Sequence, residues 1–95
     1  MLTWEIRIEF NPGDYDMYEI ENAISEIIGK TTCGSGYCLS TGNRDLDYRI
    51  KKDKKEVDKK VRKILKHLDQ IDIEYELEVG TERKTYFSTM VKKPK

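Results

Sequence analysis

Apolar and polar residues alternate strictly at the start of the chain. From Leu2 to Phe10 every second residue is apolar, and the residues between them are polar or charged. A period of two places successive side chains on opposite faces of an extended backbone. Residues 2–10 are therefore predicted to form a strand with one buried face.

The pattern then changes to helical spacing. After a break at residues 11–13, apolar residues recur every three or four positions from Met17 to Ile28, which indicates an amphipathic helix. Asp16 and Glu19 have the spacing of a capping box at the start of this helix. Gly29 suits the left-handed conformation that often ends a helix.

A second helix is predicted further along the chain. Apolar residues from Val57 to Leu68 fall on one narrow face of a helix, as in the first helical segment. Asp53 and Glu56 again have the spacing of a capping box. These signals together predict a second amphipathic helix.

The segment between the two helices is predicted to form a β-hairpin. Gly42 and Asn43 tolerate positive φ angles, which suits a two-residue turn. With that turn, apolar residues pair on one face of the hairpin and polar residues pair on the other. The predicted pairs are Leu39 with Leu46, Tyr37 with Tyr48, Ser40 with Asp45, and Cys38 with Asp47.

Alternation returns near the end of the chain. Apolar residues from Ile71 to Val79 alternate with acidic residues, which predicts another strand with one buried face. Residues 80–84 are expected to form a turn, residues 85–91 a last strand at the sheet edge, and residues 92–95 a loose basic tail. Residues 1–91 are thus expected to form a single domain.

The predicted order is strand, helix, strand, strand, helix, strand, with an extra C-terminal edge strand. Over residues 2–79 this order resembles the ferredoxin-like split βαβ arrangement. The stretch GSGYCLSTGNRDLDYRI at residues 34–50 is also similar to segments of small uncharacterised proteins of that architecture. The resemblance implies an α+β sandwich, with an antiparallel sheet and both helices on one face. It implies no activity, because many unrelated functions use this arrangement.

Charge is separated along the chain although it cancels overall. The sequence has 18 basic and 18 acidic residues. Residues 49–66 contain ten Lys or Arg residues and three acidic ones, whereas residues 1–30 contain seven acidic residues and two basic ones. Residues 69–82 contain six acidic residues and no basic residue. The distribution of charge, unlike the net charge, therefore carries information about partners.

Basic side chains of the second predicted helix fall directly opposite its apolar face. At about 100° per residue they form a stripe without an acidic residue. Such a stripe is either a solvated helix face or a surface that follows a phosphate backbone. A nucleic-acid-binding module is therefore the alternative function. This group, called here the basic stripe, consists of Lys55, Lys59, Arg62, Lys63 and Lys66.

The outward residues of the first and last core strands are mostly acidic. If these strands are neighbours, as the resemblance implies, the acidic side chains lie together on the face away from the helices. Aromatic residues such as Trp4 and Tyr75 face inward, so this face lacks the platform on which ferredoxin-like RNA binders stack bases. An acidic face repels phosphate and suits a basic protein surface. The candidate protein-binding residues are Glu5, Glu9, Asp72, Glu74, Glu76 and Glu78.

Residues that could carry catalysis or hold a metal are few. Cys33 and Cys38 would point to opposite faces of one strand, and His67 is the only histidine. Two thiols and one imidazole do not make a closed zinc site. The sequence before Lys30 lacks the upstream glycine of a phosphate-binding loop. No catalytic residue, metal ligand or cofactor is therefore predicted, and enzyme activity is not expected.

The expected function is that of a non-enzymatic interaction module, such as a regulator, an inhibitor or an immunity-type protein. It would bind a protein partner through the acidic face or through an exposed edge strand. Self-association through opposite charges on two copies is a further expectation. The chain enters a charged strand within its first five residues, and no apolar run approaches the length of a membrane span. A cytoplasmic location without membrane contact is therefore expected.

Overall fold

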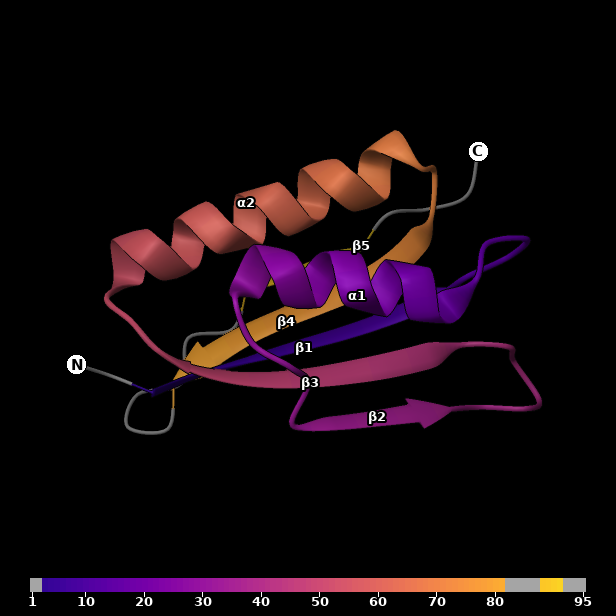
Figure 1. The fold of residues 1–95 in the computed structure, drawn as a ribbon, viewed down its shortest axis with the longest axis horizontal. Helices are drawn as coiled ribbons and strands as arrows, with labels where there is room; N and C mark the ends of the chain where they lie inside the picture. The colour runs from indigo at the N-terminus through magenta and orange to yellow at the C-terminus, as the bar shows by residue number, and fades with distance from the viewer. Residues whose placement is uncertain (1–2, 82–87, 92–95) are drawn as a thin grey trace.

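Two helices cover one face of an antiparallel sheet (Figure 1). The computed structural model describes residues 3–81 and 88–91 and has an α+β architecture. The predicted turn and last strand fall partly on residues 82–87, which lie outside the described residues, as does the basic tail. The elements are β1 (Thr3–Asn11), α1 (Met17–Ile28), β2 (Gly34–Tyr37), β3 (Arg44–Lys51), α2 (Lys54–Gln70), β4 (Glu74–Thr81) and β5 (Ser88–Val91).

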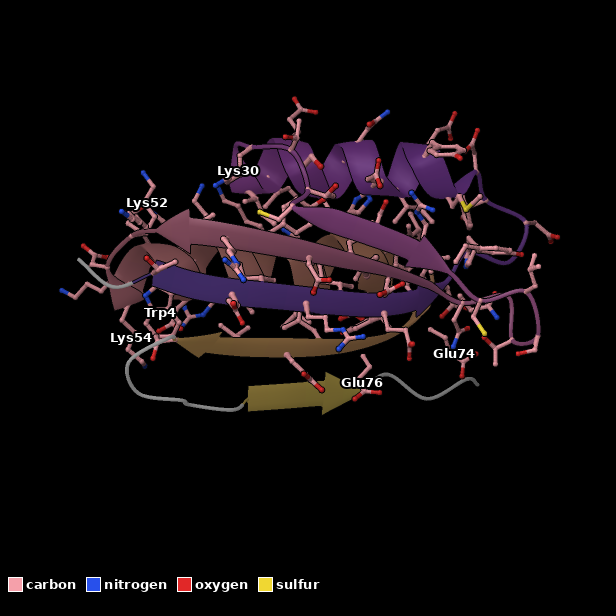
Figure 2. The ribbon with its side chains drawn as sticks, turned by 90° about the horizontal axis from the view of Figure 1, so that it is seen from below. Trp4, Lys30, Lys52, Lys54, Glu74 and Glu76 are labelled. Atoms are coloured by element: carbon pink, nitrogen blue, oxygen red, sulfur yellow. The ribbon has the colours of Figure 1, made fainter. Side chains whose placement is uncertain are left out.

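β1 is the central strand of the sheet. The strands lie in the order β2-β3-β1-β4-β5, which can be followed in Figure 2. Every neighbouring pair is antiparallel. β1 therefore has β3 on one side and β4 on the other, so that strands from opposite ends of the chain lie next to each other.

The predicted alternation of the first strand is confirmed. Every second residue of β1 from Trp4 to Phe10 is buried. β3 and β4 alternate in the same way, and the helices contribute Ile24 and Ile64, which have no exposed surface. Burying one such side chain contributes roughly 1.5–3 kcal/mol, so this shared apolar layer holds the helices on the sheet.

The predicted helix starts, and the predicted end of α1, are confirmed. Asp16 Oδ1 accepts a hydrogen bond of 2.8 Å from the N–H of Tyr18, and Asp53 Oδ1 accepts one of 2.9 Å from the N–H of Glu56. Gly29 ends α1 with a φ of 87°, a conformation that costs glycine little. Local capping chemistry therefore sets these boundaries.

Two buried tyrosines connect strands to helices. The Tyr48 hydroxyl of β3 lies 2.7 Å from Ser25 Oγ of α1, and burial raises the pKa of Tyr48. The Tyr75 hydroxyl of β4 donates a hydrogen bond of 3.2 Å to Asp69 Oδ1 of α2. Burial, followed by the charge of Asp69, raises the pKa of Tyr75 to about 12. Both phenols therefore remain neutral at physiological pH.

The predicted register of the hairpin is wrong. β2 ends at Tyr37, whose partner on β3 is Arg44 rather than Tyr48. Leu39, predicted to pair with Leu46, lies in the connecting loop with 89% of its surface exposed. The loop is longer than the predicted two-residue turn, and the polar pairs predicted with it do not form.

Two glycines are compatible with the observed register and favour it. Gly36 lies opposite Asp45, and a Cβ atom at Gly36 would lie 2.5 Å from Asp45 Oδ1. A larger residue at position 36 would require the Asp45 side chain to move. Gly42 has a φ of 74°, and its N–H donates a hydrogen bond of 2.8 Å to the carbonyl of Cys38, which closes the longer loop.

The fourth strand begins at Glu74, three residues later than predicted. Asp72 has a φ of 56°, and the N–H of Ile73 donates a hydrogen bond of 3.1 Å to the carbonyl of Leu68. This is the hydrogen bond of a Schellman helix end, here with aspartate in the position that glycine usually takes. Helix termination therefore takes the first residues of the alternating segment out of the strand.

Candidate functional site

The face of the sheet that carries no helix, called here the open face, is lined by charged side chains. Buried residues of β1, β3 and β4 point toward the helices, so the residues between them point away. The charged residues of the open face are Asp45, Asp47, Arg49 and Lys51 on β3; Glu5, Arg7 and Glu9 on β1; and Glu74, Glu76 and Glu78 on β4.

A row of three carboxylates crosses the open face. Glu9 on β1 is the direct partner of both Asp45 on β3 and Glu76 on β4. Neighbouring strands lie about 4.8 Å apart, so three like charges stand side by side on adjacent strands. Like charges directly opposite each other destabilise a sheet.

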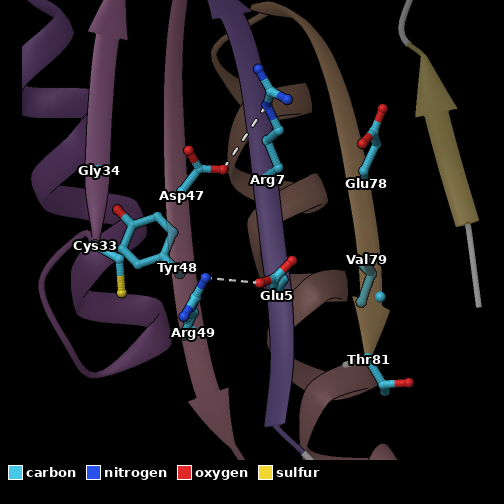
Figure 3. Close-up of a pocket in the computed structure, with 11 residues that line it drawn as sticks. Glu5, Arg7, Cys33, Gly34, Asp47, Tyr48, Arg49, Glu78, Val79 and Thr81 are labelled. Carbon is cyan, nitrogen blue, oxygen red and sulfur yellow. Dashed lines mark ion pairs between the residues drawn. The ribbon is translucent and has the colours of Figure 1, made fainter. Parts of the chain in front are cut away.

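The arginines of the open face are engaged by neighbouring acidic residues. Arg7 Nη2 lies 3.7 Å from Asp45 Oδ2, and Arg7 Nε lies 4.0 Å from Asp47 Oδ1. Arg49 Nη2 lies 3.2 Å from Glu5 Oε1; this pair and that of Arg7 with Asp47 are drawn in Figure 3. Exposed pairs of this kind contribute roughly 0.2–1 kcal/mol each. They offset the negative charges of Asp45, Asp47 and Glu5.

The remaining acidic side chains lie on β4 and on the neighbouring part of β1. None of the residues described in the structure forms an ion pair with Glu9, Glu74, Glu76 or Glu78. Two shallow hollows, of about 160 and 210 Å³, lie here; Glu9 and Glu76 line both, and Arg7 also lines the second. Such hollows suit an ammonium or guanidinium group. These four residues are called here the acidic trough.

A larger hollow of about 730 Å³ lies further along the open face (Figure 3). It is flanked by Gly34 on β2 and Gly80 on β4, which have no side chains to fill it. Arg7, Arg49 and Glu5 line its floor. Because opposite charges are mixed here, this hollow favours neither anions nor cations as strongly as the acidic trough favours cations.

The basic stripe lies on the other side of the protein, on the outer surface of α2. Its five residues, Lys55, Lys59, Arg62, Lys63 and Lys66, are all exposed, and no described residue forms an ion pair with any of them. Lys60 differs, because its Nζ donates hydrogen bonds of 3.3 and 3.0 Å to the carbonyls of Ile27 and Ile28. Lys60 therefore caps the end of α1.

The structure brings five of the six predicted acidic residues to the open face: Glu5, Glu9, Glu74, Glu76 and Glu78. The prediction for Asp72 is wrong, because this residue lies in the turn between α2 and β4. Asp45 and Asp47 belong to the same face; they were expected on the polar face of the hairpin but were not included among the candidate binding residues. Their alternation with Leu46 and Tyr48, which are buried, is the signal that places them on this face.

A buried ion pair on the helix side of the sheet was also not predicted. Arg44 is only 7% exposed, and its Nη2 lies 2.9 Å from Glu21 Oε1 of α1. Its guanidinium carbon lies 5.1 Å from the centre of the Tyr18 ring. This pair ties β3 to α1, and an arginine in an alternating strand gives no sequence signal for such a partner.

Cys33 and Cys38 are free, exposed thiols. Hydrogen bonds with Ser40, whose Oγ lies 3.2 Å from Cys38 Sγ, and with Thr41 lower the pKa of Cys38 to about 7. Within the described part of the chain, no group of three or more His, Cys, Asp or Glu side chains could hold a metal ion.

α1 has 12 residues and α2 has 17, and no helix in residues 3–81 or 88–91 is long and apolar enough to cross a bilayer.

No protein-family model, curated protein or solved structure matches this chain.

Proposed function

We propose that this protein is a small non-enzymatic interaction module that binds a basic protein partner through its open face, with the acidic trough as the main contact. We also assign its fold to the ferredoxin-like split βαβ arrangement. The order β2-β3-β1-β4 and the position of both helices on one side of the sheet support that assignment. The fold alone does not determine the function, which rests on the open face.

The observation that carries this proposal is the direct pairing of Glu9 with Glu76 across β1 and β4. Two unit charges about 5 Å apart repel by about 0.8 kcal/mol even in bulk water. Glu74 and Glu78 flank this pair along β4 and add to the negative potential. A lysine or arginine placed between the two strands would relieve the repulsion and interact with several carboxylates at once.

The same features favour a protein partner over a nucleic acid at this face. Carboxylates repel phosphate, and the aromatic residues of β1, β3 and β4 are buried on the other side of the sheet. The hollows of the trough are shallow and small, so they suit single basic side chains presented by a larger surface better than they suit a whole small molecule.

Binding of a lysine-rich peptide tests the proposal. Calorimetric titration at low salt should show binding to the wild type, and the Glu9→Gln, Glu76→Gln double variant should bind at least about tenfold more weakly, equivalent to about 1.4 kcal/mol. High salt should abolish the difference because it screens exposed charges.

The matched control is the Glu19→Gln, Glu26→Gln double variant. It removes the same number of charges from exposed positions on α1 and should bind almost as tightly as the wild type. An equal loss in both double variants would mean that only net charge matters. That result, or a wild type that does not bind, would overturn the proposed role of the trough.

A second candidate function is nucleic-acid binding through the basic stripe. The observation in its favour is that all five stripe residues are exposed and unpaired among the described residues. Binding to duplex DNA would weaken steeply with salt and with Lys59→Glu and Lys63→Glu. Failure of the wild type to retain duplex DNA at low salt would remove this candidate.

A further inference from the structure

We infer that a second copy of this chain is itself a ligand of the open face, with the basic stripe of one molecule seated on the acidic trough of the next. The inference builds on the proposed use of the open face and names one occupant for it. Three features support it: the positions of the two surfaces, the spacing of their charged residues and the opposite signs of those charges.

The two surfaces lie on opposite sides of the protein. α2 packs against the sheet through Val57, Ile64 and Leu68, which are fully buried. The basic stripe is on the outer surface of that helix, and the open face is on the far side of the sheet (Figures 1 and 2). One molecule therefore cannot bring its own stripe to its own trough, and any contact between them joins two copies.

The spacing of charges on the two surfaces is similar. Lys55, Lys59 and Lys63 follow one another along α2 at intervals of about 6 Å, because a helix rises about 1.5 Å per residue. The acidic residues of β4, from Glu74 to Glu78, follow at about 6.7 Å, because alternate residues of a strand share one face. The difference over three charges is about 1.4 Å, which flexible lysine side chains can absorb.

The charges of the two surfaces are opposite in sign, and neither set forms ion pairs with the described residues of its own molecule. The stripe offers five positive groups and the trough four negative ones, without ion pairs to other described residues. Because the net charge of the chain is zero, two copies approach without overall repulsion. Complementary patches then set their relative orientation.

Contact between two different surfaces does not stop at a dimer. Each copy that uses its trough still has a free stripe, so the contact is heterologous and continues as an open chain unless it closes into a ring. A single helix covers only part of the sheet, so the contact is smaller than the roughly 800 Å² per partner of stable complexes. The association should therefore be weak and strongly dependent on salt.

Sedimentation equilibrium with two complementary variants tests the inference. The trough variant carries Glu9→Gln and Glu76→Gln, and the stripe variant carries Lys59→Gln and Lys63→Gln, so that neither variant gains a charge that could pair with the other. Between about 10 µM and about 1 mM protein, the mass of the wild type should rise without a plateau at about 0.01 M salt. It should be that of a monomer at about 1 M salt, where charges are screened beyond about 3 Å.

Each variant alone should remain monomeric at low salt, because it has lost one of the two surfaces. The mixture should form a 1:1 complex and grow no further, since the trough variant keeps its stripe and the stripe variant keeps its trough. Circular dichroism verifies that both variants are folded. If association recovers on mixing, each variant has lost one surface but has kept its fold.

A wild type that stays monomeric at about 1 mM and about 0.01 M salt would overturn the inference, as would a mixture without a 1:1 complex. If such a monomer still binds the lysine-rich peptide through Glu9 and Glu76, the proposed function stands and only the second copy is excluded as a ligand. If neither peptide nor second copy binds, both proposals fail.

Discussion

At the scale of single residues, neighbouring hydroxyl groups set the chemistry of the Cys38 thiol. Ser40 Oγ lies 3.2 Å from Cys38 Sγ, and Thr41 adds further hydrogen bonds. These bonds stabilise the thiolate and lower the pKa of Cys38 from 9.0 to about 7. More of the Cys38 side chains are therefore thiolates at neutral pH than is usual for cysteine.

We expect Cys38 to react faster than Cys33 with iodoacetamide at pH 7, because the thiolate is the nucleophile. Thiolate forms as the pH rises, so the rate at Cys38 should increase through a midpoint of about pH 7. Ser40→Ala should move that midpoint upward. Peptide mass spectrometry at a series of pH values measures both rates; equal profiles for the two cysteines would contradict the expectation.

Residue-level predictions from the sequence succeeded where the interaction is local. Asp16, Asp53 and Gly29 act within one turn of the helix ends that they define, so spacing alone identifies them. Asp72 differs because its left-handed conformation accompanies a helix end whose flanking residues, Leu68 and Ile73, are buried in the core. That packing is a tertiary effect, which the alternation pattern does not contain.

At the scale of elements, Lys60 links the two helices. Its position on α2 brings its ammonium group to the carbonyls of Ile27 and Ile28 at the end of α1. A cation at that end satisfies free carbonyl groups and complements the helix dipole. Lys60 is thus a structural residue, although it neighbours the basic stripe.

Lys60→Met keeps most of the aliphatic side chain and removes the ammonium group. We expect it to lower the free energy of unfolding by about 1 kcal/mol, because the last carbonyls of α1 lose a charged donor. Urea denaturation measures the change. Lys59→Met is the matched control on the exposed stripe and should stay within about 0.5 kcal/mol of the wild type; equal effects would argue against a capping role.

The elements that periodicity predicted are those long enough to show a repeat. β1, α1 and α2 each contain several buried positions at regular spacing, and they were predicted to within about two residues. β2 has four residues and contains Gly34 and Gly36, so it offers no apolar repeat. Its register is seen in its pairing with β3, and four residues without an apolar repeat leave no pattern that predicts that pairing.

At the scale of the whole molecule, charge is separated between two opposite surfaces. The charge runs and the helical and strand periods were sufficient to predict the basic stripe and most of the open face. Which acidic groups remain unpaired depends on the reach of Arg7 and Arg49 across neighbouring strands. The acidic trough is therefore a property of the folded sheet that the sequence indicates only in outline.

The most direct test of the central claim is to map a basic ligand on the protein by NMR. Amide chemical shifts would be followed while a lysine-rich peptide is added at low salt to the Lys59→Gln, Lys63→Gln variant, so that contact between copies contributes little and α2 gains no acidic residue. We predict that the largest shifts occur in β1 and β4 around Glu9 and Glu76, and that the amides of α2 change little. Shifts centred elsewhere, or no shifts at saturating peptide, would contradict the claim that the acidic trough is the binding surface.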